Sequence, residues 1–162
     1  KRPVKVVNDA AMQAVGSYKS GKMLFLGLGT GLGSTMIVDG IIEPMELAHL
    51  PYKQGTYEDY VGARSLETRG KKKWRRHVAD VVELLIAALE PDDVVIGGGN
   101  VKELKELPKG SRRGDNANAF RGGFRLWEEP DRHRNSMRAT SRSAVASKTK
   151  RSKKNDEIHR AR

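Results

Sequence analysis

The chain has 162 residues, of which 37% are hydrophobic and 31% charged, so it is long enough for one domain with a buried core and has no stretch of membrane-spanning length. It contains no cysteine, which excludes disulfides, thiolate zinc sites and cysteine nucleophiles and fits a cytoplasmic setting. The formal net charge is +11. The first residue is Lys1 and not Met, and we interpret the sequence as a piece of a larger protein.

The first predicted elements are a strand over residues 3–7, which are mostly β-branched, and a helix over residues 10–16, which ends at a glycine. Asp9 therefore lies where the strand becomes the helix. Two roles stay open for its carboxylate. It caps the helix N-terminus, or it acts as a general base that takes a proton from a substrate hydroxyl.

Two short apolar runs, residues 23–26 and 35–38, predict a β-hairpin, and Asp39-Gly40 predicts a tight turn after it. The hairpin tip carries four glycines in alternate positions, Gly27, Gly29, Gly31 and Gly33. This pattern fits neither the Rossmann fingerprint nor the Walker A loop. The tip is either a tight turn without a ligand or a loop whose backbone N–H groups, around Thr30, bind a phosphate.

A polar cluster follows over residues 43–52. Glu46 and His49 lie three residues apart, so a single helical turn places both side chains on one side. Glu58 adds a carboxylate shortly afterwards. Each of these residues has an ordinary structural or solvated interpretation. Together with Asp9 they form a set of hydrogen-bonding groups suited to the hydroxyls of a sugar.

Residues 65–89 predict one long helix that ends before Pro91, with a repeating apolar face that we assign to the core: Trp74, Val78, Val81, Val82, Leu85 and Leu89. The N-terminal half of this helix is strongly basic, with Lys71, Lys72, Lys73, Arg75 and Arg76. Such a run is usually a solvated face. Beside a phosphate cleft it would also attract a long polyanion.

Residues 93–96 predict a buried strand that runs into Gly97, Gly98 and Gly99, followed by Asn100 and a helix through Leu107. A strand, a glycine turn and a helix start form an arrangement that binds anions in many proteins, because the first helical N–H groups lack partners.

The end of the chain differs in composition. Residues 131–162 hold 11 Lys and Arg against 3 Asp and Glu, whereas residues 1–130 hold 20 against 17. The tail has few large apolar residues, so we expect residues 131–162 to be disordered and residues 1–130 to form the domain. The tail is either a solvated extension or an arm that binds polyanions. No aromatic residue interrupts the tail, so it offers no surface for base stacking and we do not expect nucleic acid as a partner.

Several of these motifs, in this order and spacing, resemble the C-terminal part of ROK-family sugar kinases: Val6-Val7-Asn8-Asp9-Ala10, residues 26–33, residues 46–49 and Gly97-Gly98-Gly99-Asn100. Residues 43–52, 56–62, 71–78 and 114–123 are similar to the polyphosphate glucokinases within that family. The resemblance covers residues 3 to about 128. It implies an actin-like, ribonuclease-H-like α/β domain with a mixed sheet and flanking helices.

The resemblance also implies an activity, the transfer of a phosphoryl group from inorganic polyphosphate or ATP, with Mg²⁺, to the 6-hydroxyl of glucose. Asp9 resembles the catalytic base and Asn8 a sugar contact. Further sugar contacts are implied at Glu46, His49 and Glu58. Phosphate contacts are implied at Gly29, Thr30, Gly31, Gly98 and Gly99, and a homodimer is implied for the complete enzyme.

The sequence departs from the family in two respects. The cysteine-rich zinc loop of many ROK proteins has no counterpart here, so no zinc is expected. The Asp-x-Gly-Gly-Thr phosphate loop of the family's N-terminal domain is also missing from this sequence. We therefore expect the chain by itself to bind glucose weakly without phosphorylating it, and the alternative is a non-catalytic module that binds a sugar or a polyanion.

Overall fold

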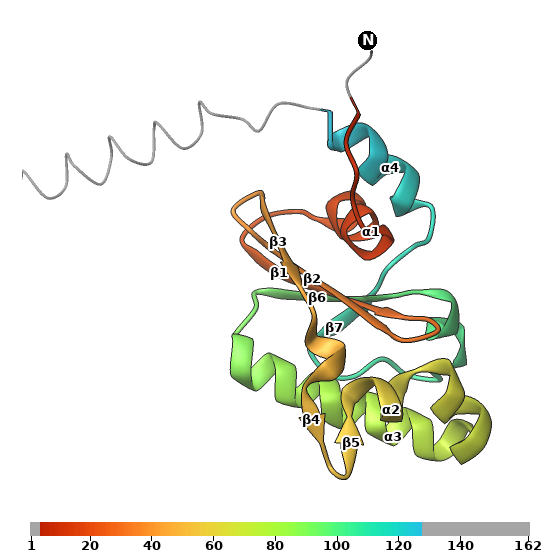
Figure 1. Ribbon diagram of the computed structural model, residues 1–162. Helices are drawn as coiled ribbons and strands as arrows, with labels where there is room; N and C mark the ends of the chain where they lie inside the picture. Colours follow the sequence, from red (N-terminus) through yellow and green to blue (C-terminus); the bar gives the residue numbers. More distant parts are fainter. Residues whose placement is uncertain (1–3, 128–162) are drawn as a thin grey trace, which may run out of the picture. The chain divides into compact units, whose positions relative to one another are not determined.

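Five strands form one mixed sheet in the computed structural model, which describes residues 4–127 (Figure 1). In spatial order they are β3 (Ile41–Met45), β2 (Leu32–Val38), β1 (Lys22–Leu28), β6 (Asp93–Gly97) and β7 (Ser111–Arg113). The first three pair antiparallel, and β1, β6 and β7 pair parallel. This confirms the expected mixed sheet. A separate two-stranded sheet joins β4 (Pro51–Tyr52) to β5 (Gly55–Thr56).

Helices cover both faces of the five-stranded sheet (Figure 1). Helix α1 (Asp9–Ser17) packs on one face, and α4 (Asn118–Arg125) packs on α1. Helices α2 (Tyr57–Val61) and α3 (Ala63–Leu89) lie on the other face, and two 3₁₀ helices, η1 (Leu47–His49) and η2 (Gly99–Glu103), lie in the connections.

The alternation of side chains along β1 explains why both faces need a cover. Met23 and Phe25 pack in the cluster that includes Ala10 and Ala14 of α1. On the other face a larger cluster joins Leu24, Leu26 and Leu28 to the predicted core face of α3, and Trp74 in that cluster is fully buried. The indole N–H of Trp74 donates to the carbonyl oxygen of Val61 at 2.8 Å, so the buried polar atom has a partner.

Asp39 and Gly40 form the predicted turn between β2 and β3, with φ values of 50° and 86°. Positive φ at both central residues is the geometry of a type I′ hairpin turn, which the Asp-Gly sequence favours. The register places Gly27 opposite Gly33 and Leu28 opposite Leu32. The hairpin tip between β1 and β2 is therefore residues 29–31, which we call the first glycine turn.

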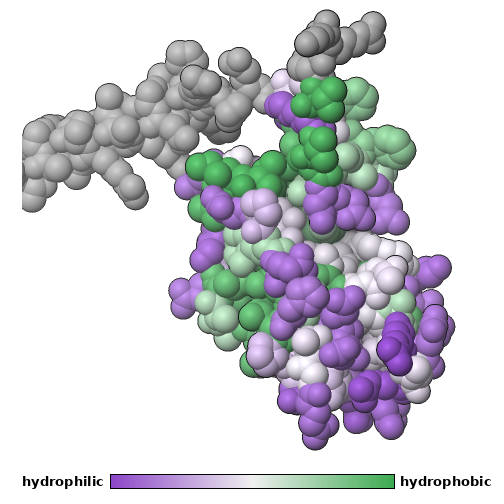
Figure 2. Space-filling model, viewed as in Figure 1, coloured by the Kyte–Doolittle hydropathy of each residue, from purple (hydrophilic) through white to green (hydrophobic). Residues whose placement is uncertain are grey.

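The prediction of a strand near the N-terminus is wrong for the residues described. Residues 4–8 belong to no strand or helix, because the edges of the sheet are β3 and β7 and neither pairs with this segment. Instead the amine of Lys5 donates to the carbonyl oxygen of Leu126 and lies 5.0 Å from the centre of the Trp127 ring. Val4 and Val6 are 81% and 93% exposed. Figure 2 shows hydrophobic surface at this end of the domain.

Two predicted helices also differ from the structure. The helix expected over residues 65–89 begins at Ala63 and is broken at Gly70, whose φ of 76° and ψ of 158° are not helical. The helix expected to run through Leu107 is replaced by the short η2, which ends at Glu103. The N-cap of η2 is Gly98, which has a φ of 86°. Because glycine has no side chain, it cannot supply the oxygen that normally caps a helix start.

The expected boundary at residue 130 and the basic tail over residues 131–162 lie outside the residues that the structure describes. Within residues 4–127, no helix has the length and apolar character needed to cross a membrane.

Candidate active site

The first glycine turn is held from two directions. The side-chain amide of Asn100 donates to the carbonyl oxygen of Gly29 at 2.9 Å, and the backbone N–H of Ala63 donates to that of Thr30 at 3.0 Å. Within the turn, the N–H of Gly29 donates to the carbonyl oxygen of Gly31 at 3.1 Å. A side chain on Gly29 would meet no atom within 4 Å. The turn is therefore fixed in shape while the space beside Gly29 stays open to a ligand.

Gly98, Gly99 and Asn100 form a second glycine turn that lies directly beside the first. The bond from Asn100 to Gly29 joins the two turns. A Cβ atom on Gly98 would collide with the backbone of Leu28, and the φ of 86° also requires glycine there. Around Gly99, in contrast, no atom lies where a Cβ would stand. The structure thus brings together the two glycine segments that the sequence analysis assigned to phosphate binding.

Glu58 reaches the first glycine turn from α2. Its carboxylate carbon lies 2.9 Å from the place that a Cβ on Gly31 would take, so the two residues are in close contact. A capping box fixes the start of α2: Thr56 N–H donates to the carboxylate of Asp59 at 2.9 Å, and Asp59 N–H donates to Thr56 Oγ1 at 3.4 Å. The hydrogen bonds from Thr56 lower the pKa of Asp59. The box therefore sets the direction in which Glu58 points.

His49 ends the 3₁₀ helix η1 and Glu46 is the residue just before it, so the two flank one short turn. His49 Nε2 lies 4.0 Å from Glu46 Oε1, and both side chains are about 70% exposed. Ser34 fastens this segment to β2, because its hydroxyl donates to the carbonyl oxygen of Met45 at 2.9 Å and accepts from Leu47 N–H at 3.1 Å. The two side chains therefore reach solvent from a segment anchored close to the first glycine turn.

Asn8 and Asp9 form the start of α1. Asn8 is the N-cap, and its side-chain oxygen accepts from Ala10 N–H at 2.7 Å. Asp9 Oδ1 accepts from the same N–H at 2.8 Å. Both side chains are exposed. Ala10 contacts β2, since its Cβ lies 3.0 Å from the position of a Cβ on Gly33. The first turn of α1 is thus held beside the strand that follows the first glycine turn.

The segments that carry the polar groups each contact residues 29–34, the hairpin tip and the first residues of β2. Glu58 contacts Gly31, the first turn of α1 contacts Gly33, and the segment with Glu46 and His49 is bonded to Ser34. Among the described residues, the side chain of Asp9 forms no hydrogen bond or ion pair with Glu46, His49 or Glu58. Glu46 and His49, in contrast, lie within ion-pair distance of each other, at 4.0 Å.

This arrangement has two chemically different halves. Carboxylate, imidazole and amide groups at Asn8, Asp9, Glu46, His49 and Glu58 suit the hydroxyls of a sugar, since they both donate and accept hydrogen bonds. The two glycine turns leave open space beside the backbone of Gly29 and Gly99, as glycine-rich phosphate sites do. Within residues 4–127, no group of three or more His, Cys, Asp or Glu residues fits a metal ion. The described residues thus do not form a magnesium cage.

Three residues that hold the candidate site together were not predicted from the sequence. Asn100 belongs to a quoted motif but had no assigned role, and Ala63 and Ser34 were not singled out. The Asn100 bond reaches Gly29, 71 positions away in the chain, so the Gly-Gly-Gly-Asn sequence by itself did not indicate it. The bonds made by Ala63 and Ser34 depend on how α3 and η1 pack on the hairpin, which a local pattern does not show.

The solved structures that resemble this chain include sugar kinases of the same fold. An inorganic polyphosphate/ATP-glucomannokinase from Arthrobacter sp. strain KM is 24% identical with a TM-score of 0.63, covering 76% of this chain and 58% of that one. A ROK hexokinase from Thermus thermophilus is 20% identical with a TM-score of 0.59, covering 75% and 63%. A ROK family glucokinase from Streptomyces griseus, solved with glucose and AMPPNP, is 15% identical with a TM-score of 0.61, covering 76% and 68%.

The chain has the fold of the ROK-family sugar kinases and spans less than two thirds of the length of the first two. The same fold occurs in a ROK family transcriptional regulator, a homologue of the E. coli MLC protein, at 13% identity and a TM-score of 0.56. No protein-family model and no curated protein matches the sequence.

Proposed function

We propose that this chain is the sugar- and phosphate-binding part of a glucokinase that uses inorganic polyphosphate or ATP. The observation that carries the proposal is the bond between Asn100 and Gly29, because it joins two glycine turns that have open space beside Gly29 and Gly99. The resemblance of the sequence to polyphosphate glucokinases supports it, as does a fold shared with a glucomannokinase and a glucokinase.

In this proposal Asp9 is the general base. Its carboxylate accepts the proton of the sugar's 6-hydroxyl while the hydroxyl oxygen bonds to the transferred phosphorus and the bond to the donor's leaving oxygen breaks. Asn8, Glu46, His49 and Glu58 hold the other hydroxyls and thereby orient the sugar. Backbone N–H groups of the glycine turns stabilise charge on the transferred group. Mg²⁺ belongs to the proposal as an ion that accompanies the donor's phosphates.

The charge beside the glycine turns favours polyphosphate as the donor. Helix α3 starts at the bond between Ala63 and Thr30, and η2 starts at Gly99, so both lead away from the turns. Two contacts join α3 to η2. Lys71 lies 2.5 Å from the Glu103 carboxylate, and this hydrogen bond lowers the pKa of Glu103. Arg75 donates to the Glu103 carbonyl oxygen at 2.6 Å. Exposed cations nearby in sequence are Lys72, Lys73, Arg76, Lys102 and Lys105. A long polyanion leaving the turns would meet this surface.

A second candidate function is a non-catalytic module that binds a sugar or a polyanion. It is supported by the transcriptional regulator, which has the same fold. The kinase and a sugar-binding module both need the sugar contacts. They differ in phosphoryl transfer, which needs groups on both sides of the phosphate, and the chain spans 58% of the glucomannokinase. We expect no steady formation of glucose 6-phosphate by this chain alone.

The first prediction concerns glucose affinity. We expect the chain to bind glucose in the millimolar range, because each hydrogen bond in an open site contributes only about 0.5–1.5 kcal/mol. Glu46→Gln removes a charged acceptor and should weaken binding roughly fivefold, within that range. Glu43→Gln is the matched control, since Glu43 is an exposed carboxylate on the neighbouring edge strand β3. Titration calorimetry or NMR titration measures the affinities.

Equal affinities for the unaltered chain and Glu46→Gln would remove Glu46 from the sugar site. The absence of any glucose binding would contradict both the kinase and the sugar-binding candidates.

A further inference from the structure

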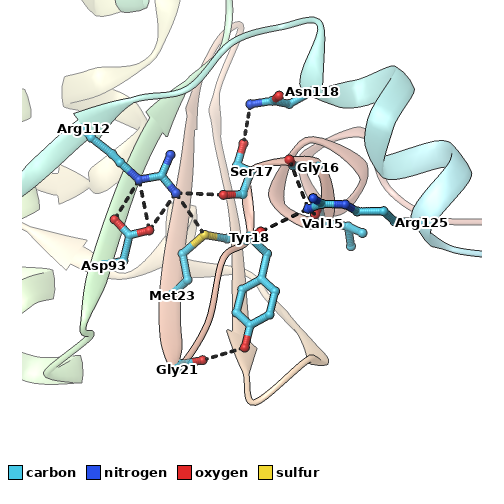
Figure 3. A network of polar contacts seen from close by, with 10 residues as sticks. All are labelled: Val15, Gly16, Ser17, Tyr18, Gly21, Met23, Asp93, Arg112, Asn118 and Arg125. Carbon is cyan, nitrogen blue, oxygen red and sulfur yellow. Dashed lines mark hydrogen bonds and ion pairs between the residues drawn. The ribbon is translucent and has the colours of Figure 1, made fainter. Parts of the chain in front are cut away.

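The C-terminal end of α1, far from Asn8 and Asp9, is held by arginine (Figure 3). Arg125 of α4 places one guanidinium nitrogen, Nη1, against three carbonyl oxygens at this end, those of Val15 at 3.1 Å, Gly16 at 3.4 Å and Tyr18 at 3.0 Å. The last carbonyls of a helix have no partner within it and carry partial negative charge. A cation placed here satisfies them and fixes the end of α1 to α4.

A second arginine ties the same end of α1 to the sheet. Arg112 of β7 donates from Nη2 to the carbonyl oxygen of Ser17 at 2.8 Å and makes a bidentate pair with Asp93 of β6, at 2.7–3.0 Å. The side chain of Asn118 donates to the hydroxyl of Ser17 at 3.0 Å. The strand β6 continues into the second glycine turn, so the Arg112–Asp93 pair connects the frame of the phosphate site to α1 (Figure 3).

The backbones of α1 and α4 are in direct contact. A Cβ atom on Gly16 would collide with the carbonyl group of Asn118, and a Cβ atom on Gly122 would collide with that of Met12. Glycine at both positions allows this approach, and it leaves α1 no room to move toward α4. On its other side α1 rests on the sheet through the buried Ala10 and Ala14.

The first turn of α1 packs on β2 through the buried Ala10, and its polar ties are local. Among the described residues, the hydrogen bonds of the Asn8 and Asp9 side chains go to Ala10 in their own turn. A nine-residue helix is a stiff rod about 13 Å long, so the position of its far end is passed along the axis. We propose that Arg125 is a positioning residue that sets the location of Asn8 and Asp9 through the C-terminal end of α1. This inference rests on the proposed sugar-binding role of these two residues.

An ordinary helix cap gives a different expectation, since the influence of a capping charge falls off within the last turn. The test therefore compares the two ends of α1. In the ¹⁵N-labelled chain, Arg125→Gln should speed exchange of the Met12 amide, which bonds to the Asn8 carbonyl oxygen at 3.0 Å, by roughly tenfold through local opening. It should also weaken glucose binding several-fold. Arg121→Gln, at an exposed arginine of the same helix, should change neither.

Arg125→Lys retains a cation that reaches the same carbonyls, so it should restore much of both properties. It also carries the test if Arg125→Gln does not fold. Faster exchange confined to residues 16–18, with unchanged glucose affinity, would overturn the proposal. If the unaltered chain binds no glucose, the proposed function fails, and exchange at Met12 still decides whether Arg125 controls the first turn.

Discussion

Asn8 and Asp9 lie together at the start of α1. The sequence left two roles open for Asp9, a helix cap and a general base. The structure gives the N-cap to Asn8, whose backbone is extended, and makes Asp9 the first helical residue with an exposed side chain. Asp9 also accepts from Ala10 N–H at 2.8 Å, so its carboxylate helps to satisfy the helix start together with Asn8. The role of Asp9 as base stays a proposal.

Gly98 and Gly99 are neighbours with opposite surroundings, so the same substitution should affect stability differently at the two positions. Gly98 has a positive φ and faces the backbone of Leu28, whereas Gly99 faces open space. Gly98→Ala should lower the free energy of unfolding by about 2 kcal/mol or more, since strain and collision add. Gly99→Ala should change it by less than about 0.5 kcal/mol. Urea denaturation of both variants measures the difference.

Similar stabilities for the two variants would show that the second glycine turn relaxes easily. It would then be a poor candidate for a fixed phosphate site.

At the scale of elements, the best predictions came from signals that need no distant partner. The turn at Asp39-Gly40 and the buried face of α3 were of this kind, and both are confirmed. The segment over residues 4–8 failed because a strand requires a neighbour, and the sheet offers it none. Gly70 was overlooked because a single glycine inside a helical pattern does not reveal whether the chain continues or breaks there.

The link between β4 and α3 was also missed, since its members lie far apart in sequence. The hydroxyl of Tyr52 donates to Asp80 at 2.9 Å and lies 3.2 Å from Nδ1 of His77, and the ring of Tyr60 packs edge-on against His77. Burial, followed by the bond to Asp80, raises the pKa of Tyr52 to about 12. Tyr52 therefore stays a neutral donor at physiological pH.

His77 in this link predicts a pH dependence of stability. Burial, with the cations Lys53 and Arg69, lowers the pKa of His77 from its ordinary 6.5, while Asp80 acts in the opposite direction. As pH falls through 6.5, the unfolded chain binds a proton that the folded chain does not yet bind, so the free energy of unfolding falls. The loss ends once the folded histidine is also protonated.

His77→Gln should remove this part of the pH dependence between about pH 7.5 and pH 5. The exposed His49 provides the control variant His49→Gln, which should keep it. Chemical denaturation at several pH values measures the slopes. An unchanged slope in His77→Gln would show that other groups cause the dependence.

For the whole molecule, the site is assembled from elements that are distant in the chain. The starts of α1 and α2, the segment at η1 and the two glycine turns meet around residues 29–34. The sequence predicted a chemical role for each part from its residue types. It could not show their meeting, which depends on the parallel pairing of β1 with β6 and on the helices that pack on each face.

The central claim is that this chain has a sugar half and a phosphate half in one site. Amide chemical shifts of the ¹⁵N-labelled chain, titrated separately with glucose and with tripolyphosphate, test it most directly. We predict that glucose shifts residues 8–10, 46–49 and 58, and that tripolyphosphate shifts residues 29–31 and 98–100. Glucose shifts that avoid the first set, or tripolyphosphate shifts confined to the basic residues of α3, would contradict the account.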